Sequence, residues 1–367
     1  MQMLSELFSD LEDPRCGNAK RHDFMELLFI ALSCVLSGGT TCVDMALFAR
    51  MRQDFLKKFI KMENGPPFHD TFSRLFRRLD PKGLQRCLMR FVKHLARDLP
   101  AEVVALDGKS VRRSFDKAAK KGALHLVQAF ACESRLVLGQ LAVADKSNEI
   151  TAIREFLLLL DLRGALVTAD AMHCQRETAA LICERGGHYV LACKGNQGEL
   201  HEDIRTFFAD AEQSFELHQD TDGGHGRVEE RTVRVSHDVD WLRERHEWPS
   251  LAGIASVERR WEEDGKPKKS VRYFIMSKPM TAAEVARVVR AHWQIENALN
   301  WVLDVTFDED GQRNRKDATA ENLSALRRIA LNLARLEPSK GSMRGKLKRA
   351  AWNEDFLASL LHAAANI

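Results

Sequence analysis

Through the first hundred residues, hydrophobic positions recur every three or four residues, and strand-like alternation is absent. This spacing predicts helices over residues 25–36, 43–59, 71–79 and 84–95. Asp80 followed by Pro81 suits the start of the last helix, because aspartate caps a first turn and proline is tolerated there. Residues 1–100 are therefore expected to form a compact helical domain.

The pattern changes near residue 101, where short apolar runs alternate with helical segments. Strands are predicted over residues 102–106, 124–132, 136–144, 165–168 and 188–193, and helices over 149–160 and 175–185. Three successive strands joined by short turns indicate an antiparallel meander, and helical crossovers indicate parallel strands. The predicted fold class is α/β, with a mixed-sheet core whose first part spans residues 101–221.

Residues 222–280 alternate apolar and polar positions, with turn signals at 222–224 and at Asp264-Gly265. We expect this segment to be a small β-rich insertion, not a continuation of the sheet. Helix returns at Thr281, where Glu284 completes a capping-box pattern, and is expected to run through Trp301. The expected organisation ends with core helices over residues 281–335 and a basic helical tail over residues 336–367.

Composition and charge narrow the class of protein only slightly. The chain has 367 residues, of which 45% are hydrophobic and 29% charged, which is typical of a globular protein. The net charge of +3 is small, but residues 311–350 carry eleven Lys or Arg against three acids, and residues 107–122 carry six against two. Such segments can follow a phosphate backbone, and a solvated surface face explains them equally well.

Eight scattered cysteines form no CxxC pair, which argues against a structural zinc site. The apolar run over residues 24–36 contains Glu26 and is too short to cross a bilayer. No membrane association is expected, and the predicted location is the cytoplasm. The glycine-containing segment 195–198 matches no phosphate-binding loop pattern, so no nucleotide cofactor is expected.

Two aspartates follow apolar strands. Asp107 comes after residues 103–106, and Asp170 closes the strand predicted over 165–168. Carboxylates at strand ends commonly form sites in α/β sheets, and an acid in an apolar setting is costly without a partner. Carboxylate oxygens are also the ligands that Mg²⁺ prefers. Taken singly, each residue fits an ordinary aspartate in a turn as well.

A third acid, Glu296, lies in the helix predicted from Thr281. On a helix it shares one face with Trp293 and Asn300, an unusual set for a purely structural core. A surface glutamate paired with Arg290 is the alternative interpretation. Three such acids could hold two metal ions, one to activate an attacking oxygen and one to stabilise the leaving oxygen of a phosphodiester.

Seven short motifs occur in a fixed order that spans nearly the whole chain. They are VALDGK at 104–109, DKSNEI at 145–150, TADA at 168–171, LACKGNQ at 191–197, GHGRVE at 224–229, HWQIEN at 292–297 and WVLDVTF at 301–307. In this order they resemble the ISAs1 family of insertion-sequence transposases. That family includes H-repeat-associated proteins and belongs with the IS4-like DDE transposases.

The resemblance implies an RNase H-like catalytic core with a β-rich insertion, preceded by a helical domain that binds DNA ends. It implies that Asp107, Asp170 and Glu296 are the catalytic and metal-binding residues for two Mg²⁺ or Mn²⁺ ions. Double-stranded DNA and a second copy of the chain, in a homodimer, are the implied partners. The implied activity is metal-dependent DNA cleavage and strand transfer. The alternatives are a related nuclease without strand transfer and a catalytically silent DNA-binding protein derived from a transposase.

Phosphate contacts are expected from basic residues near these motifs, namely Lys109, Arg112, Arg113, Lys194, Arg227, His292, Arg313, Arg315 and Lys316. The IS4-like group carries a Tyr, an Arg and a Lys around its Glu, and this chain has Val289, His292 and Leu303 at those positions. Arg313, Arg315 or Lys316 are candidates to replace them.

Two further features lie near these motifs. His173 is a candidate to hold Asp170 in place without itself binding a metal ion. The acidic run at residues 308–310 is expected to be a solvated loop, although it resembles a second metal site in composition.

Overall fold

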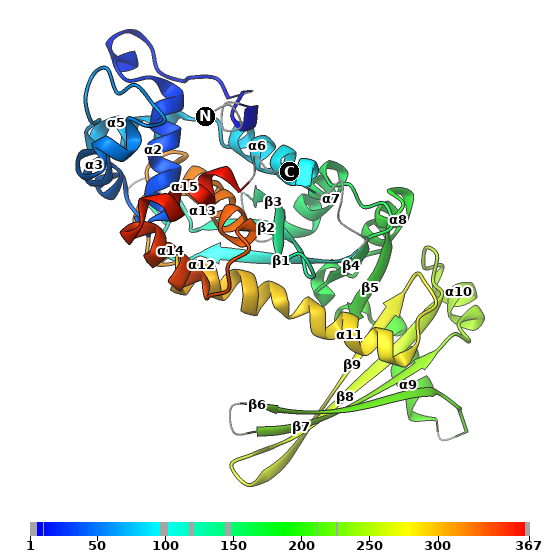
Figure 1. The fold of residues 1–367 in the computed structure, drawn as a ribbon. Coiled ribbons are helices and arrows are strands. Elements are labelled where there is room, and N and C mark those ends of the chain that lie inside the picture. Colours follow the sequence, from blue (N-terminus) through cyan, green and yellow to red (C-terminus); the bar gives the residue numbers. More distant parts are fainter. Residues whose placement is uncertain are drawn as a thin grey trace.

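A computed structural model describes residues 6–9, 11–95, 102–116, 121–143, 148–210, 212–224 and 227–363. A helical segment, a mixed α/β part, four long strands and a second helical segment follow one another along the chain (Figure 1). Residues 145–147 of the DKSNEI motif, together with His225 and Gly226, lie outside the described residues. The side chain of Arg227, a predicted phosphate contact, also lies outside them.

The N-terminal part is helical, as predicted. After the short η1 (Gly17–Lys20), its helices are α2 (Phe24–Leu36), α3 (Cys42–Met51), α4 (Gln53–Leu56), α5 (His69–Arg78) and α6 (Pro81–Leu95). Asp80 Oδ2 accepts a hydrogen bond of 2.9 Å from the Gly83 amide. The cap expected ahead of Pro81 is therefore present, because this bond satisfies an amide that has no partner within the helix.

Five strands form the first half of a mixed sheet. They are β1 (Val103–Val111), β2 (Leu124–Ala131), β3 (Leu136–Val143), β4 (Leu166–Ala169) and β5 (His188–Cys193). β1 to β3 form the predicted antiparallel meander, and β1, β4 and β5 are parallel neighbours. The helices that accompany this half are α7 (Glu149–Leu159) and α8 (Arg176–Glu184). β1 does not end at Asp107 as predicted, because its polar half remains paired with β2 through Val111.

The strands after α9 (Glu199–Ala209) correct one prediction. They are β6 (Glu216–Gly224), β7 (Arg227–Ser236), β8 (Gly253–Glu263) and β9 (Lys266–Met276), with α10 (Asp240–His246) between β7 and β8. They continue the sheet, because β9 pairs with β5 and gives the nine-stranded order β3-β2-β1-β4-β5-β9-β8-β7-β6. Only the apolar end of β9 is buried there, and its lysine-rich start extends away from the body (Figure 1).

Each face of the sheet has its own hydrophobic core. Val104 and Leu106 point into a core shared with α7 and α8, whereas Val103 and Ala105 point into a core shared with the later helices. Those helices are α11 (Ala282–His292), the π-helical segment η6 (Ile295–Asn300), α12 (Trp301–Val305) and α13 (Thr319–Leu336). Because side chains alternate along a strand, Asp107 lies on the same face as Ala105, beneath α11 and η6.

The N-terminal and C-terminal helices share one core. α13, α14 (Met343–Trp352) and α15 (Glu354–His362) all pack against α2 (Figure 1). The basic segment over residues 311–350 carries part of its positive charge in the interior, because three of its basic side chains are buried: Arg327, Arg328 and Lys346. In the described part of the chain, no helix is both long enough and apolar enough to cross a membrane.

Candidate active site

The three acids singled out in the sequence come together from three elements. Asp107 lies within β1, Asp170 directly follows β4, and Glu296 lies in η6. Leu106 and Ala169 are partners in the parallel register of β1 and β4, so the two aspartates occupy neighbouring positions. All three acids line one pocket between the sheet and the α11–η6 helix.

A π-helical segment carries Glu296. The capping box at Thr281 and Glu284 is present as predicted, and α11 ends at His292. The α-helix predicted through Trp301 is interrupted by η6, where each turn contains an additional residue. Segments of this kind occur often at functional sites. Here the geometry lets Asn300 Nδ2 donate to Glu296 Oε2 at 2.8 Å.

Burial raises the pKa of Asp107 to about 6, and the neighbouring charge of Asp170 adds to the effect. The charge interaction with His292 and the hydrogen bonds from the Gly108 amide and the Asn300 side chain oppose this rise without cancelling it. Two carboxylates that face one another in a half-buried pocket repel each other. A cation between them would relieve that repulsion.

The environment of Asp170 lowers its pKa, whereas that of Asp107 raises it, and His292 is the reason for the difference. The contact with His292 is the main reason that the pKa of Asp170 lies below its usual value, and its partial burial opposes the effect. His292 Nε2 lies 3.7 Å from Asp170 Oδ1, and its Nδ1 is bonded to Thr168 Oγ1 at 3.0 Å. His292, predicted as a phosphate contact, is therefore placed against an acid of the triad.

The donors of this site suit a hard divalent ion. Asp107, Asp170 and Glu296 offer carboxylate oxygens, which Mg²⁺ and Mn²⁺ prefer. Among the described residues, no three His, Cys, Asp or Glu side chains are gathered tightly enough to form a complete metal site by themselves. Burial and the neighbouring Asp170 nevertheless leave the charge of Asp107 incompletely compensated, and a bound cation would compensate it. These three residues are the ones that would hold it.

Lys194 and Arg272 bring positive charge to the pocket. Lys194, a predicted phosphate contact, lies just after β5, and Arg272 comes from β9. The Arg272 guanidinium lies 5.0 Å from the ring centre of Trp293, whose side chain is 45% exposed. Arg272 is not among the residues predicted from the sequence, because its place in the pocket lining depends on the pairing of β9 with β5.

The other predicted phosphate contacts whose side chains the structure describes lie outside this pocket, and one of them is internal. The ammonium group of Lys109 is buried and contacts both carboxylate oxygens of Asp304 at 2.7 Å. It presents no surface to DNA, because its strand position points beneath α12. Arg112, Arg113, Arg313 and Lys316 are exposed, and Arg315 lies over the Phe115 ring. None of these lines the acid pocket, so the proposed replacement of the missing signature by Arg313, Arg315 or Lys316 has no support there.

A buried glutamate connects the two aspartate-bearing segments. Glu149 accepts from His125 Nε2 at 2.5 Å and from His173 Nε2 at 2.8 Å. Although burial favours the neutral acid, hydrogen bonds from His173 and His125 hold the pKa of Glu149 below its ordinary value. Its carboxylate also packs where a side chain at Gly108 would stand. His173 therefore supports the Asp170 turn as suggested, through a partner that the DKSNEI motif contains.

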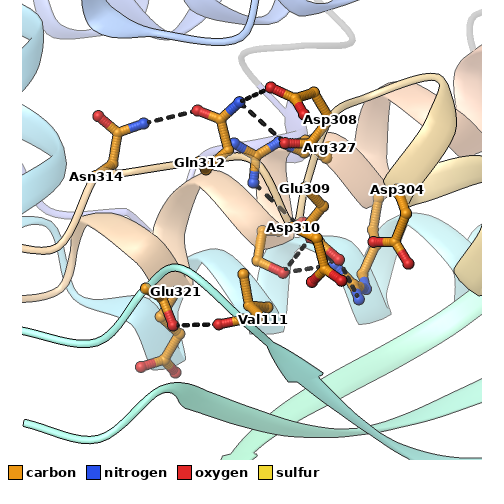
Figure 2. A network of polar contacts seen from close by, with 12 residues as sticks. Val111, Asp304, Asp308, Glu309, Asp310, Gln312, Asn314, Glu321 and Arg327 are labelled. Atoms are coloured by element: carbon orange, nitrogen blue, oxygen red, sulfur yellow. Dashed lines mark hydrogen bonds and ion pairs between the residues drawn. The ribbon is translucent and has the colours of Figure 1, made fainter.

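The acidic run at residues 308–310 is not the solvated loop that was expected. Glu309 is fully buried, and its carboxylate lies 2.8 Å from Arg328 and 3.8 Å from Arg327. Although burial favours the neutral acid, Arg328 and Arg327 hold the pKa of Glu309 below its usual value. Figure 2 shows this loop, with Gln312 bonded to Asp308 and Arg327 above Glu309. The carboxylate at its centre is neutralised by arginine and does not form a second metal site.

Comparison with known proteins identifies the family. The profile described as "DDE_Tnp_1-associated" matches residues 5–92, and the "Transposase DDE domain" profile matches residues 98–333. The chain is 35% identical to "Putative transposase YncI" of Escherichia coli, with 100% of this chain and 96% of that protein covered. It is also 35% identical to "H repeat-associated putative transposase YhhI" of Escherichia coli, with 98% of each covered.

Among solved structures, the piggyBac transposase synaptic complex with hairpin DNA gives a TM-score of 0.44 at 11% identity. The alignment of the two structures covers 97% of this chain and 77% of the piggyBac chain. The family profile and the relatives identify the family, since both extend across the part of the chain that contains the acid pocket. The chain belongs to the DDE transposase family, and its fold is the mixed α/β, RNase H-like fold of that family.

Proposed function

We propose that this chain is an active transposase, which cuts DNA at the ends of an insertion sequence and joins the freed ends to target DNA. One observation carries the proposal: Asp107, Asp170 and Glu296 come from separate elements and line one pocket. Pre-positioned groups on rigid elements are what a phosphoryl-transfer site requires.

The residues of the pocket have distinct roles in this proposal. Asp107, Asp170 and Glu296 would hold two Mg²⁺ or Mn²⁺ ions, which activate an attacking oxygen and stabilise the leaving one when bound. Lys194 and Arg272 would hold phosphate oxygens of the DNA strand. His292 keeps Asp170 ionised through the contact described above.

Two displacements at phosphorus make up the reaction. In the first, water replaces the 3′ oxygen of a phosphodiester, which leaves a 5′ phosphate and a free 3′-hydroxyl. In the second, that hydroxyl attacks a phosphodiester of target DNA, forms a new bond to its phosphorus and releases another 3′-hydroxyl. Each bond broken is replaced by one bond formed, so no covalent protein intermediate and no nucleotide cofactor are needed.

Double-stranded DNA and a second copy of the chain are the proposed partners. Two element ends must be brought together, so the active complex is a homodimer with one catalytic site for each end. The helical domain over residues 1–100 would bind the ends. Arg112, Arg113, Arg227, Arg313 and Lys316 would contact phosphates beyond the pocket, and Arg315 would hold the Phe115 loop beside them.

Nicking of supercoiled plasmid DNA that carries the element's ends tests the proposal. Wild-type protein is compared with Asp107→Asn, Asp170→Asn and Glu296→Gln in Mg²⁺, in Mn²⁺ and in EDTA, and metal binding is followed by calorimetry. We expect metal-dependent nicking by the wild type and loss of more than a hundredfold in each variant. Asp161→Asn is the matched control, because this acid lies outside the pocket and pairs with the exposed Arg163, which is not among the proposed DNA contacts.

The outcomes separate the alternatives. Joined products beside nicked products support strand transfer, whereas nicked products alone favour a related nuclease. DNA binding by the wild type without any metal-dependent cleavage would leave a silent DNA-binding protein.

A further inference from the structure

We infer that Gln128 and Asn300 are positioning residues of the acid site, joined in a one-way chain of side-chain hydrogen bonds. This hydrogen-bond chain starts from the buried Arg328–Glu309 ion pair and ends on Asp107 and Glu296. Its catalytic consequence rests on the proposed function. Its existence does not, and the two are tested by separate measurements below.

The chain ends at the Asn300 amide, which holds two acids from different elements. Asn300 Nδ2 donates to Asp107 Oδ2 at 3.1 Å and to Glu296 Oε2 at 2.8 Å. The Asn300 side chain lies in the interior, with 5% of its surface exposed. One oxygen of each carboxylate is thus engaged by the amide, and the other oxygen of each receives no bond from it.

An amide can bond in two orientations, and only one of them presents donors to the acids. Here Gln128 Nε2 donates to Asn300 Oδ1, which directs the Asn300 NH₂ group toward the carboxylates. Gln128 is fixed in its turn, because Arg328 Nη2 donates to Gln128 Oε1 at 2.9 Å. A guanidinium has donors and no acceptor, so it sets the direction of every amide that follows it.

The anchor of the chain is charged and completely buried. Arg328 and Glu309 are each 0% exposed, and Arg328 Nη1 lies 2.8 Å from Glu309 Oε1. A buried ion pair is weak evidence for stability alone, because removing both charges from water is costly. The pair has a specific role here, because Arg328 fixes the orientation of Gln128 and, through it, that of the Asn300 amide at the acid site. Partners that orient metal-binding groups in this way commonly change metal affinity or activity by about 10-fold to 100-fold when they are removed.

The sheet supplies a matched control for the test. Gln128 on β2 and Gln140 on β3 are register partners, and both are buried glutamines. Gln140 bonds to Ser324 Oγ and to the Glu321 carbonyl, not to Asn300. Methionine at either position keeps the length of the side chain and removes both the amide donor and the amide oxygen. Only Gln128→Met therefore breaks the hydrogen bonds that join Arg328 to Asn300.

Metal-dependent nicking tests the catalytic consequence. We expect Gln128→Met to nick at least tenfold more slowly than Gln140→Met, and to need more Mg²⁺ for half-maximal activity. Thermal denaturation of both variants shows how much stability each has lost. Equal nicking rates and equal Mg²⁺ dependence in the two variants would overturn the inference.

Side-chain amide NMR tests the chain without any reaction. Asn300→Asp identifies the Asn300 NH₂ signals by their disappearance. In wild type and Gln140→Met these protons should exchange slowly with water, and in Gln128→Met at least tenfold faster. If the Asn300 NH₂ protons exchange with water as slowly in Gln128→Met as in wild type, the hydrogen-bond chain through Gln128 is overturned. A wild type that shows protected amide protons but no nicking would instead mean that the proposed function fails.

Discussion

At the scale of single residues, the half-buried Asp107 and the fully buried Glu309 show two opposite outcomes for a carboxylate withdrawn from water. Glu309 is enclosed with Arg328 and Arg327, so its charge is compensated inside the protein. Asp107 faces Asp170, and the compensation of its charge by His292, Gly108 and Asn300 is incomplete. The charge of Glu309 is thus paired within the interior, whereas that of Asp107 remains incompletely compensated at the candidate site.

Asp107→Asn should stabilise the metal-free protein at neutral pH. The pKa of Asp107 in the folded protein, about 6, lies above its ordinary value of 3.8, so the folded state binds this proton more tightly than the unfolded state. The resulting stability is complete below pH 3.8 and is lost as the pH rises through 6. At pH 8 in EDTA the variant should be more stable by on the order of 3 kcal/mol.

Urea denaturation of the metal-free proteins at pH 8 and pH 4 measures this effect. The gain should shrink toward zero at the lower pH, where wild-type Asp107 is protonated. A variant that is no more stable than wild type at pH 8 would contradict the environment assigned to Asp107.

Glu309→Gln should be strongly destabilising. Removing one partner of a buried ion pair leaves Arg328 uncompensated, which costs roughly 3–5 kcal/mol. Asp310→Asn, in the same loop, weakens a pair with the exposed Arg112 guanidinium and keeps an oxygen for the Arg112 amide, so it should cost no more than about 1 kcal/mol. Chemical denaturation of both variants checks the difference, and similar losses would show that the buried pair is not the main contribution.

At the scale of elements, the helix that carries Glu296 combines a regular start with an irregular end. Its start is determined locally by the capping box of Thr281 and Glu284. Its end departs from α-helical geometry over Ile295–Asn300, where side chains must reach Asp107 on another element. The first part can be changed with little effect on the site, and the second cannot.

Thr281→Ala should lower the free energy of unfolding by about 1 kcal/mol, because one amide of the first helical turn loses its acceptor. Thr281→Ser keeps the hydroxyl group and should stay near wild type. Nicking by Thr281→Ala should be unchanged below its melting temperature, since the site lies more than three turns away along the helix. A large loss of nicking with little loss of stability would show that the cap also controls the site.

At the scale of the whole molecule, the nine-stranded sheet brings distant parts of the chain to one pocket. Arg272 lines the acid pocket because β9 adds to the sheet beside β5. Long, largely exposed strands extend from this point away from the body (Figure 1). The part of the chain predicted to be a separate insertion therefore contributes directly to the candidate site.

Arg272→Ala should weaken DNA binding and reduce its dependence on salt concentration. Each phosphate contact that is lost lowers the slope of log affinity against log salt by about one. Arg243→Ala is the control, since this exposed arginine pairs with Asp240 on α10. Fluorescence anisotropy with labelled duplex DNA across a salt series measures both slopes, and equal slopes for the two variants would remove Arg272 from the proposed interface.

Local order was readable from the sequence. The helices of the first hundred residues, the meander, the caps at Asp80 and Thr281, and the chain order of the three acids depend on neighbouring residues. Hydrophobic periodicity and capping report such short-range preferences directly. The motifs also identified the family, which the comparisons confirm. The roles of Asp107, Asp170 and Glu296 remain a prediction.

Only the tertiary structure decided which side chains meet. Lys109 and Glu309 looked like surface charges and are buried against Asp304 and Arg328, while Arg272 enters the pocket from a distant strand. The pairing of β5 with β9 and the contacts of Asn300 join residues 80 to 200 positions apart. Local periodicity carries no record of such pairings, because each depends on which surfaces the packed sheet and helices bring together.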